Sequence, residues 1–212
     1  MELRYTLFYL IEHIEVYLRA VITNYISLKY GNFGHKDISN YKKKNFQKST
    51  LKELEREIKR NKKSSFIHNF KENYEGGEIP FYSAIEVTSF GTIFKMYKNM
   101  ENDDKKEIAK VFEVDYIYLE SWIENLSYVR NICAHYGRLY GAKLTKTLKL
   151  YKEYLSQGMS NNTIFASIIN IKILAEDDYY DKFHTDLLEL IDKYPSVGLK
   201  RLGFIEKWLI II

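Results

Sequence analysis

The N-terminal part of the chain repeats apolar residues with the period of an amphipathic helix. These residues recur every three or four positions, the spacing of one helical face; they are Leu3, Leu7, Leu10, Ile14, Leu18, Val21 and Tyr25. Glu15 and Arg19 lie one turn apart, so they can form an ion pair. Gly31 is a typical residue for ending a helix. The pattern therefore predicts one long helix over residues 3–29.

Further helical patterns follow, separated by polar segments. The basic segment 35–48 is predicted to be a loop, and its run Lys42-Lys43-Lys44 fits either solvated surface, which is commoner, or a phosphate contact. The stretch that begins at Ser49 opens with an S/T-x-x-E capping pattern, Thr50 to Glu53, and Asp103 is the predicted cap of a later helix. The predicted helices cover residues 49–63, 65–74, 80–100, 103–114, 117–140, 144–157, 161–175 and 179–193, and an irregular tail begins at Pro195.

The composition agrees with a helical fold. The chain contains two prolines and 10 glycines in 212 residues, whereas an all-β fold needs many turns. No internal repeat, low-complexity tract or convincing strand pattern is present. We therefore expect an all-α fold, a helical bundle that forms a single domain over residues 1–212.

Charge and cysteine content exclude some classes of site. The 32 Lys and Arg residues exceed the 28 Asp and Glu residues, giving a net charge of +4 that is compatible with a polyanion partner without identifying one. Cys133 is the single cysteine, and no histidine has a partner at metal-ligand spacing, so we expect no disulfide and no metal site. The sequence also lacks a P-loop and a nucleophile elbow. Charged residues interrupt the apolar N-terminus, which predicts a cytoplasmic protein without a membrane partner.

The stretch "SYVRNICAHYGRLYG", residues 127–141, carries the main candidate chemistry. On a helical wheel, one apolar stripe contains Leu119, Trp122, Leu126, Val129, Cys133, Tyr136 and Tyr140. Asn131, His135 and Arg138 fall together on the opposite side. Arg130 lies near the edge of the stripe, from which its long side chain can extend towards His135. This arrangement predicts a basic cluster, although the spacing alone also fits an ordinary exposed helix face.

This stretch and its surroundings resemble the Abi-like abortive-infection family (the AbiD/AbiF group) of the HEPN superfamily. Four blocks carry the resemblance: "LIEHIEVYLRAVITNYISLKYG", "IPFYSAIEVTSFGTIFKMYKNM", "LESWIENLSYVRNICAHYGRLYG" and "LGFIEKW". The resemblance implies an HEPN-like bundle core over about residues 1–140, with a C-terminal helical extension over about residues 141–212. Members of that family usually carry a further segment ahead of the first bundle helix, whereas this chain starts almost directly on that helix.

The resemblance also implies an activity. Active HEPN proteins are metal-independent endoribonucleases that use an R-x(4–6)-H motif, here Arg130 and His135, followed by a polar residue, here Asn131. Histidine suits acid–base catalysis near neutral pH, and arginine suits phosphate binding. We therefore assign His135 as general acid/base, Arg130 as transition-state stabiliser and Asn131 as a positioning residue. Arg138 is a candidate RNA contact. Tyr136 could stack on a base, but its position on the apolar stripe favours core packing.

The expected partners follow from the same assignment. One chain supplies one such histidine, so a homodimer would complete the site, with no cofactor. RNA is the expected substrate, within bacterial defence against phage, and a noncoding RNA or an antitoxin is a further candidate partner. Two alternatives use the same residues: a non-catalytic RNA-binding module in a ribonucleoprotein or toxin–antitoxin-like complex, and a structural helical dimer. The intact string Arg-Asn-x-x-Ala-His argues against the structural dimer. Glu12, Glu15 and Arg19 match the family pattern only loosely, so we expect ion-pair or packing roles for them.

Overall fold

A computed structural model describes residues 2–73 and 75–212 of the chain. Helices make up 71% of the structure. Within the described residues no strand is present. The prediction of an all-α fold is therefore confirmed.

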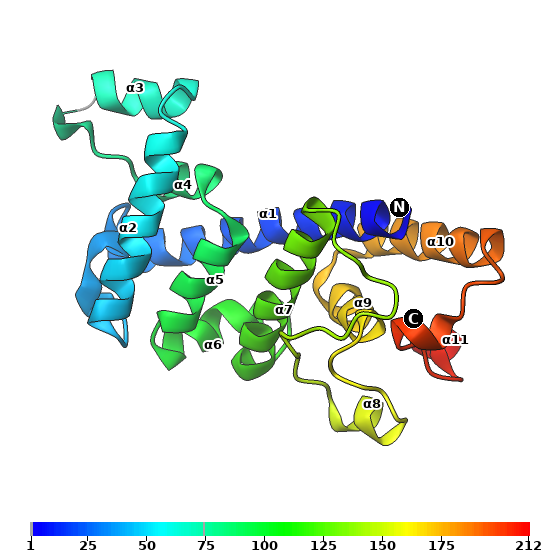
Figure 1. The fold of residues 1–212 in the computed structure, drawn as a ribbon. Helices are drawn as coiled ribbons and strands as arrows, with labels where there is room; N and C mark the ends of the chain where they lie inside the picture. Colours follow the sequence, from blue (N-terminus) through cyan, green and yellow to red (C-terminus); the bar gives the residue numbers. More distant parts are fainter. Residues whose placement is uncertain (1, 74) are drawn as a thin grey trace. The chain divides into compact units, whose positions relative to one another are not determined.

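The helix α1, Glu2–Tyr30, is the long N-terminal helix that the apolar period predicted. It is one continuous helix in Figure 1, and Gly31 follows it with a positive φ of 80°, which suits glycine. The residues up to Glu15 belong to one compact unit together with Ile117–Ile212, whereas the remainder of α1 belongs to a second unit, Val16–Tyr116. A single domain over residues 1–212 stays a prediction.

The unit Val16–Tyr116 consists of α1 from Val16 onwards and several shorter helices. These are α2 (Lys44–Arg60), α3 (Ser65–Asn73), α4 (Phe81–Ala84), α5 (Phe90–Asn99) and α6 (Asn102–Lys110), with 3₁₀ turns at Gly34–Lys36, Ile38–Asn40, Glu75–Gly77 and Ile85–Val87. Its buried apolar residues include Ile22, Ile26, Phe81, Ile93 and Tyr97. In the second half of α1 the buried apolar residues are Leu18, as predicted, Ile22 and Ile26; the last two lie one residue later than the predicted Val21 and Tyr25, which are only partly buried.

The other unit is built around α9, Ile164–Leu174, which is apolar and buried on nearly every side. The other helices of this unit are α7 (Tyr116–Ala134, from Ile117 onwards), α8 (Lys152–Ser156), α10 (Asp177–Lys193) and α11 (Trp208–Ile211), with a 3₁₀ turn at Leu199–Leu202. On α7 the side chain of Asn125 is fully buried and accepts a hydrogen bond of 2.7 Å from Ser167 of α9. This polar contact fixes the position of α9 against α7.

The predicted helix 144–157 is wrong for most of its length, because only Lys152–Ser156 is helical. The segment before it is non-helical and forms hydrogen bonds with α7. Trp122 Nε1 donates to the carbonyl of Lys149 at 2.6 Å, and Asn125 Nδ2 donates to that of Lys146 at 2.7 Å. Since these side chains occupy backbone acceptors that a helix would use, the extended form is stabilised by tertiary contacts.

The predicted helix 80–100 is also wrong as one element, because it is interrupted between Val87 and Phe90. Thr88 donates its hydroxyl to the carbonyl of Ala84, and Ser89 accepts from the backbone N–H of Thr92 as the N-cap of α5. Hydrogen bonds between a side chain and a backbone group a few residues away compete with the backbone hydrogen bonds of a continuous helix.

Two predicted caps are wrong as well. Helix α2 begins at Lys44, before the predicted cap Thr50, so its first turn occupies the end of the predicted loop. The N-cap of α6 is Glu101, and Asp103 lies in its first turn. Across the described ranges, none of the helices combines the length and the apolarity that a bilayer span requires.

Candidate functional site

Helix α7 ends at Ala134, so the predicted helix 117–140 is six residues too long. The N–H of Gly137 donates to the carbonyl of Ile132 at 2.7 Å, and the N–H of Tyr136 donates to that of Cys133 at 3.2 Å. These two bonds and the positive φ of Tyr136, 56°, define a Schellman motif that ends the helix. A Cβ at Gly137 would lie 2.8 Å from Cγ2 of Ile132, so the motif requires glycine there.

The apolar stripe of α7 is confirmed up to this end. Leu119, Trp122, Leu126, Val129 and Cys133 are all buried. Burial raises the pKa of the Cys133 thiol to about 11, so it stays a neutral, packed side chain, as predicted. Tyr136 is 77% exposed and Tyr140 is half-buried, because both follow the end of the helix. The prediction that Tyr136 packs in the core is wrong.

Arg130 is held by residues of α1. Its Nε lies 3.4 Å from Oε2 of Glu15, whose side chain is 5% exposed, and its guanidinium carbon lies 5.2 Å from the ring centroid of Phe8. The Arg130 side chain is itself 30% exposed. A buried carboxylate on one edge and an aromatic ring against the group restrict how the guanidinium can turn. Glu15 thus forms an ion pair with Arg130, whereas the sequence had suggested Arg19 as its partner.

Asn131 and His135 lie one turn apart at the exposed C-terminal end of α7. The backbone N–H of His135 donates to the carbonyl of Asn131 at 3.0 Å, and both residues are exposed. The structure thus places these two residues on one side of the helix end, as the wheel predicted. Arg130 is bound instead on the side of Glu15, and within the described chain no hydrogen bond joins its side chain to His135.

Beyond the helix end, two arginines and two tyrosines line a hollow of about 280 Å³. We call it the basic hollow; its lining residues are Leu3, Arg4, Tyr136, Arg138, Leu139 and Tyr140. Arg4 Nη1 donates to the carbonyl of Gly137 at 3.2 Å, and its guanidinium carbon lies 5.8 Å from the centroid of the Tyr136 ring. Arg138 Nε donates to the carbonyl of Tyr140 at 2.8 Å. No sequence pattern indicated Arg4, because its site contacts, Tyr136 and Gly137, lie 132 and 133 positions away along the chain.

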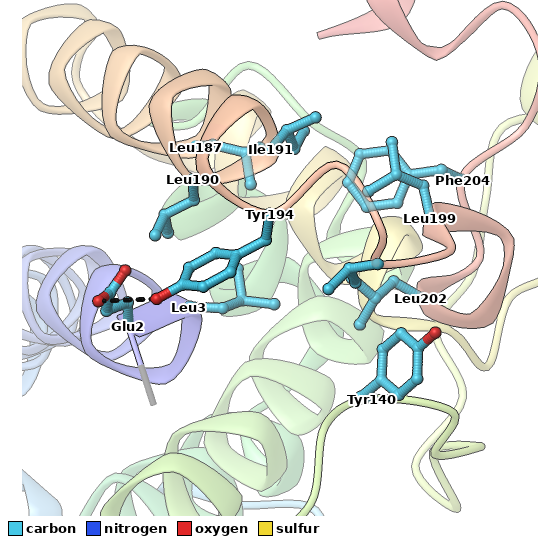
Figure 2. A pocket seen from close by; sticks show the side chains of 11 residues that line it. Glu2, Leu3, Tyr140, Leu187, Leu190, Ile191, Tyr194, Leu199, Leu202 and Phe204 are labelled. Carbon is cyan, nitrogen blue, oxygen red and sulfur yellow. Dashed lines mark hydrogen bonds between the residues drawn. The ribbon is translucent and has the colours of Figure 1, made fainter.

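A second, mostly apolar pocket of about 280 Å³ shares Leu3 and Tyr140 with the basic hollow. In Figure 2, Leu187, Leu190 and Ile191 of α10 and Tyr194, which follows that helix, lie on one side of the pocket, and Leu199, Leu202 and Phe204 lie on another. The carboxylate of Glu2 at its edge accepts from the Tyr194 hydroxyl at 3.2 Å and from Lys193 Nζ at 3.0 Å. The sequence pattern did not predict this pocket, since its walls come from both ends of the chain.

The arrangement offers an imidazole for proton transfer and guanidinium groups for binding phosphate oxygens. Among residues 2–73 and 75–212, no group of three or more His, Cys, Asp or Glu side chains is placed to hold a metal ion.

Comparison with known protein families gives a match. A family model described as "Abi-like protein" matches residues 1–141, which is more than half of the chain and includes α1, α7 and the basic hollow. No match was found among curated proteins or among solved structures.

Proposed function

Because the chain belongs to the Abi-like protein family, which suggests a role in abortive-infection defence, we propose that it is a metal-independent endoribonuclease of the HEPN type. The observation that carries the proposal is the end of α7. There Arg130 is oriented by the buried Glu15, and the exposed Asn131 and His135 lie at the terminus of the same helix.

The proposed reaction uses the 2′-hydroxyl of RNA as the nucleophile. A base removes the proton of that hydroxyl, the oxygen attacks the adjacent phosphorus, and an acid protonates the leaving 5′-oxygen. His135 performs proton transfer, and Asn131 positions the phosphate or the imidazole. Arg130 binds the phosphate oxygens and stabilises the charge that develops in the transition state. The products are a 2′,3′-cyclic phosphate and a 5′-hydroxyl.

Glu15 contributes to this mechanism by positioning Arg130. An arginine side chain has several rotatable bonds, and holding it in one orientation before the substrate binds lowers the entropy lost on binding. The Glu15 carboxylate and the Phe8 ring supply this restraint from α1. The same ion pair reduces the net charge that Arg130 offers to a phosphate. Glu15 therefore improves the placement of the Arg130 guanidinium at the expense of its affinity for phosphate.

A homodimer completes the proposed site. Each chain supplies one His135, whereas the reaction needs both an acid and a base, and two copies of the motif in one cleft would provide them. The activity per chain should therefore fall on dilution, in parallel with the dimer fraction measured by sedimentation velocity.

The central test is RNA cleavage in the presence of EDTA. Wild-type protein should cleave labelled total RNA, and His135→Ala should reduce the rate by about 10²- to 10⁴-fold, the usual contribution of acid–base catalysis. His68→Ala is the matched control, because His68 is an exposed histidine on α3. Cleavage that requires divalent ions, or that is unchanged in His135→Ala, would contradict the mechanism.

A second candidate function is RNA binding without cleavage. The basic hollow favours it, because Arg4 and Arg138 can bind phosphates without taking part in any reaction. If the wild-type protein binds RNA but leaves it intact, and His135→Ala binds it equally well, the binding module is the correct function.

A further inference from the structure

We propose that the basic hollow binds one unpaired nucleotide of the RNA, next to the phosphate that is cleaved. The base stacks on the ring of Tyr136, and its phosphate binds Arg4 and Arg138. This inference rests on the proposed function and narrows the substrate to single-stranded RNA, because a base that stacks on a protein ring must leave its own helical stack.

Tyr136 combines two features that are unfavourable for a residue with a merely structural role. Its φ of 56° lies in the left-handed region, which residues with a Cβ rarely adopt. Its ring is 77% exposed. A glycine or asparagine at this position would end the helix without strain. Backbone strain of this kind is concentrated at functional sites, and an exposed aromatic ring can stack on any base.

The two arginines are held in place by the backbone and keep donors for a ligand. Arg4 donates one side-chain hydrogen bond to Gly137, and Arg138 donates one to Tyr140. Because a guanidinium carries five N–H donors, both groups have further donors for phosphate oxygens. The residues that line the hollow include no carboxylate, so nothing in this lining neutralises the two positive charges. The basic hollow therefore suits a ligand that carries both an anionic group and an aromatic ring, as a nucleotide does.

The position of Tyr136 in the chain relates the hollow to the proposed reaction. Tyr136 directly follows His135, and consecutive α-carbons lie about 3.8 Å apart. A base on Tyr136 therefore belongs to a nucleotide beside the phosphate that His135 acts on. Stacking on a base would also give the strained backbone of Tyr136 a function. The left-handed conformation turns the ring away from the apolar stripe, in which a continued α-helix would have placed it.

The test uses a 2′-O-methyl RNA oligonucleotide that contains the fluorescent base 2-aminopurine. Methylation blocks the 2′-hydroxyl, so the probe reports binding without cleavage, and stacking on an aromatic ring quenches its fluorescence. Wild type and Tyr136→Phe should bind and quench the probe. Tyr136→Asn should bind it roughly ten- to a hundredfold more weakly and without quenching, the loss usual for one stacked base. Asparagine tolerates the positive φ, so this variant keeps the turn.

The arginines are tested by the salt dependence of binding. Arg138→Gln should lower the slope of log affinity against log salt concentration by about one, which corresponds to one lost phosphate contact. Lys152→Gln is the matched control, because Lys152 is an exposed cation on α8 that is not part of the hollow. Its slope should equal that of the wild type. Thermal unfolding of each variant verifies that it is folded.

The outcomes separate this inference from the proposed function. If Tyr136→Asn binds and quenches like the wild type, the nucleotide site is disproved, while cleavage of unmodified RNA by the wild type would still support the nuclease. If the wild type fails to bind the probe, the site is likewise disproved. If binding depends on Tyr136 but unmodified RNA stays intact, the site is supported and the nuclease is disproved.

Discussion

In the unit Val16–Tyr116, the carboxylate of Asp104 is 1% exposed and accepts hydrogen bonds from three side chains of α1. Tyr25 donates at 2.8 Å, Tyr30 at 2.9 Å, and Lys29 forms an ion pair with the same group. In the other unit, the corresponding buried carboxylate is Glu15, and its arginine partner is 30% exposed. Both carboxylates connect α1 to another helix of their own unit, and each has a partly exposed cationic partner, Lys29 at 44% and Arg130 at 30%. They differ in the groups that lie beside that partner.

This difference separates a structural cluster from a candidate site. Burial and the hydrogen bond to Asp104 raise the pKa of Tyr25 and of Tyr30, and the same carboxylate raises the pKa of Lys29. All three groups thus stay protonated and bound to Asp104 near neutral pH. Arg130 retains surface for a ligand, and His135 is exposed at the end of its helix. A buried carboxylate that binds two tyrosines and a lysine stabilises the fold, whereas one that pairs with an arginine on the helix of an exposed histidine can also position that arginine for a substrate.

The largest expected effect on stability is that of Asp104→Ala. The variant leaves two tyrosine hydroxyls and Lys29 without their common acceptor, so the free energy of unfolding should fall by about 4 kcal/mol. His135→Ala, at an exposed position, should change it by less than about 0.5 kcal/mol. Urea unfolding measures both values. Similar losses for the two variants would remove the distinction between the structural cluster and the candidate site.

A second effect comes from His35, which is 1% exposed and stacks on Phe81 with ring centroids 4.6 Å apart. Burial, assisted by Lys36 and opposed by Glu78, lowers the pKa of His35 to about 4 from 6.5. The unfolded chain therefore binds a proton more readily, so stability is fully present above pH 6.5 and decreases as the pH falls towards 4. The decrease amounts to about 3 kcal/mol for this residue.

His35→Phe should abolish this contribution, since phenylalanine can stack on Phe81 but does not titrate. Unfolding free energies of wild type and variant between pH 4 and 7 measure the difference. Parallel curves for the two proteins would show that His35 is not the residue responsible.

The smallest expected effect concerns Glu15→Gln. Loss of the ion pair to Arg130 should lower the unfolding free energy by about 2 kcal/mol, less than for Asp104 because removing Asp104 deprives three side chains of their acceptor. Cleavage should slow by about tenfold, because Arg130 is less well oriented. Glu12→Gln, at an exposed position of the same helix, is the matched control and should change neither quantity. Unaltered cleavage by Glu15→Gln would contradict the positioning role.

The sequence predicts the helices better than their ends. The apolar period identified α1, α7 and α10, because burial of one face determines each of them. Helix α9 was also predicted, although it is buried on nearly every side. The end of α7 could not be read from the period, since it depends on a left-handed Tyr136 and on the close approach of Gly137 to Ile132. The extended segment before α8 depends on hydrogen bonds from Trp122 and Asn125, which are tertiary contacts.

The candidate site was predictable in part for a similar reason. Asn131 and His135 are one turn apart, so a helical wheel brings them together. Arg4 and Glu15 are distant in sequence from the residues that they contact, and no spacing rule connects them. Tyr136 was assigned to the core because the wheel assumed that the helix continued.

The unit that contains His135 is held together by hydrogen bonds between residues that lie far apart in the chain. Arg4 and Gly137 are separated by 133 positions, and Glu2 and Lys193 by 191. In Val16–Tyr116, the bond between Tyr25 and Asp104 spans 79 positions. Domains fold as units while the ribosome adds residues from the N-terminus, so Val16–Tyr116 can fold first. The unit that contains His135 closes only after α10 has been synthesised, because its contact between Glu2 and Lys193 needs the end of that helix.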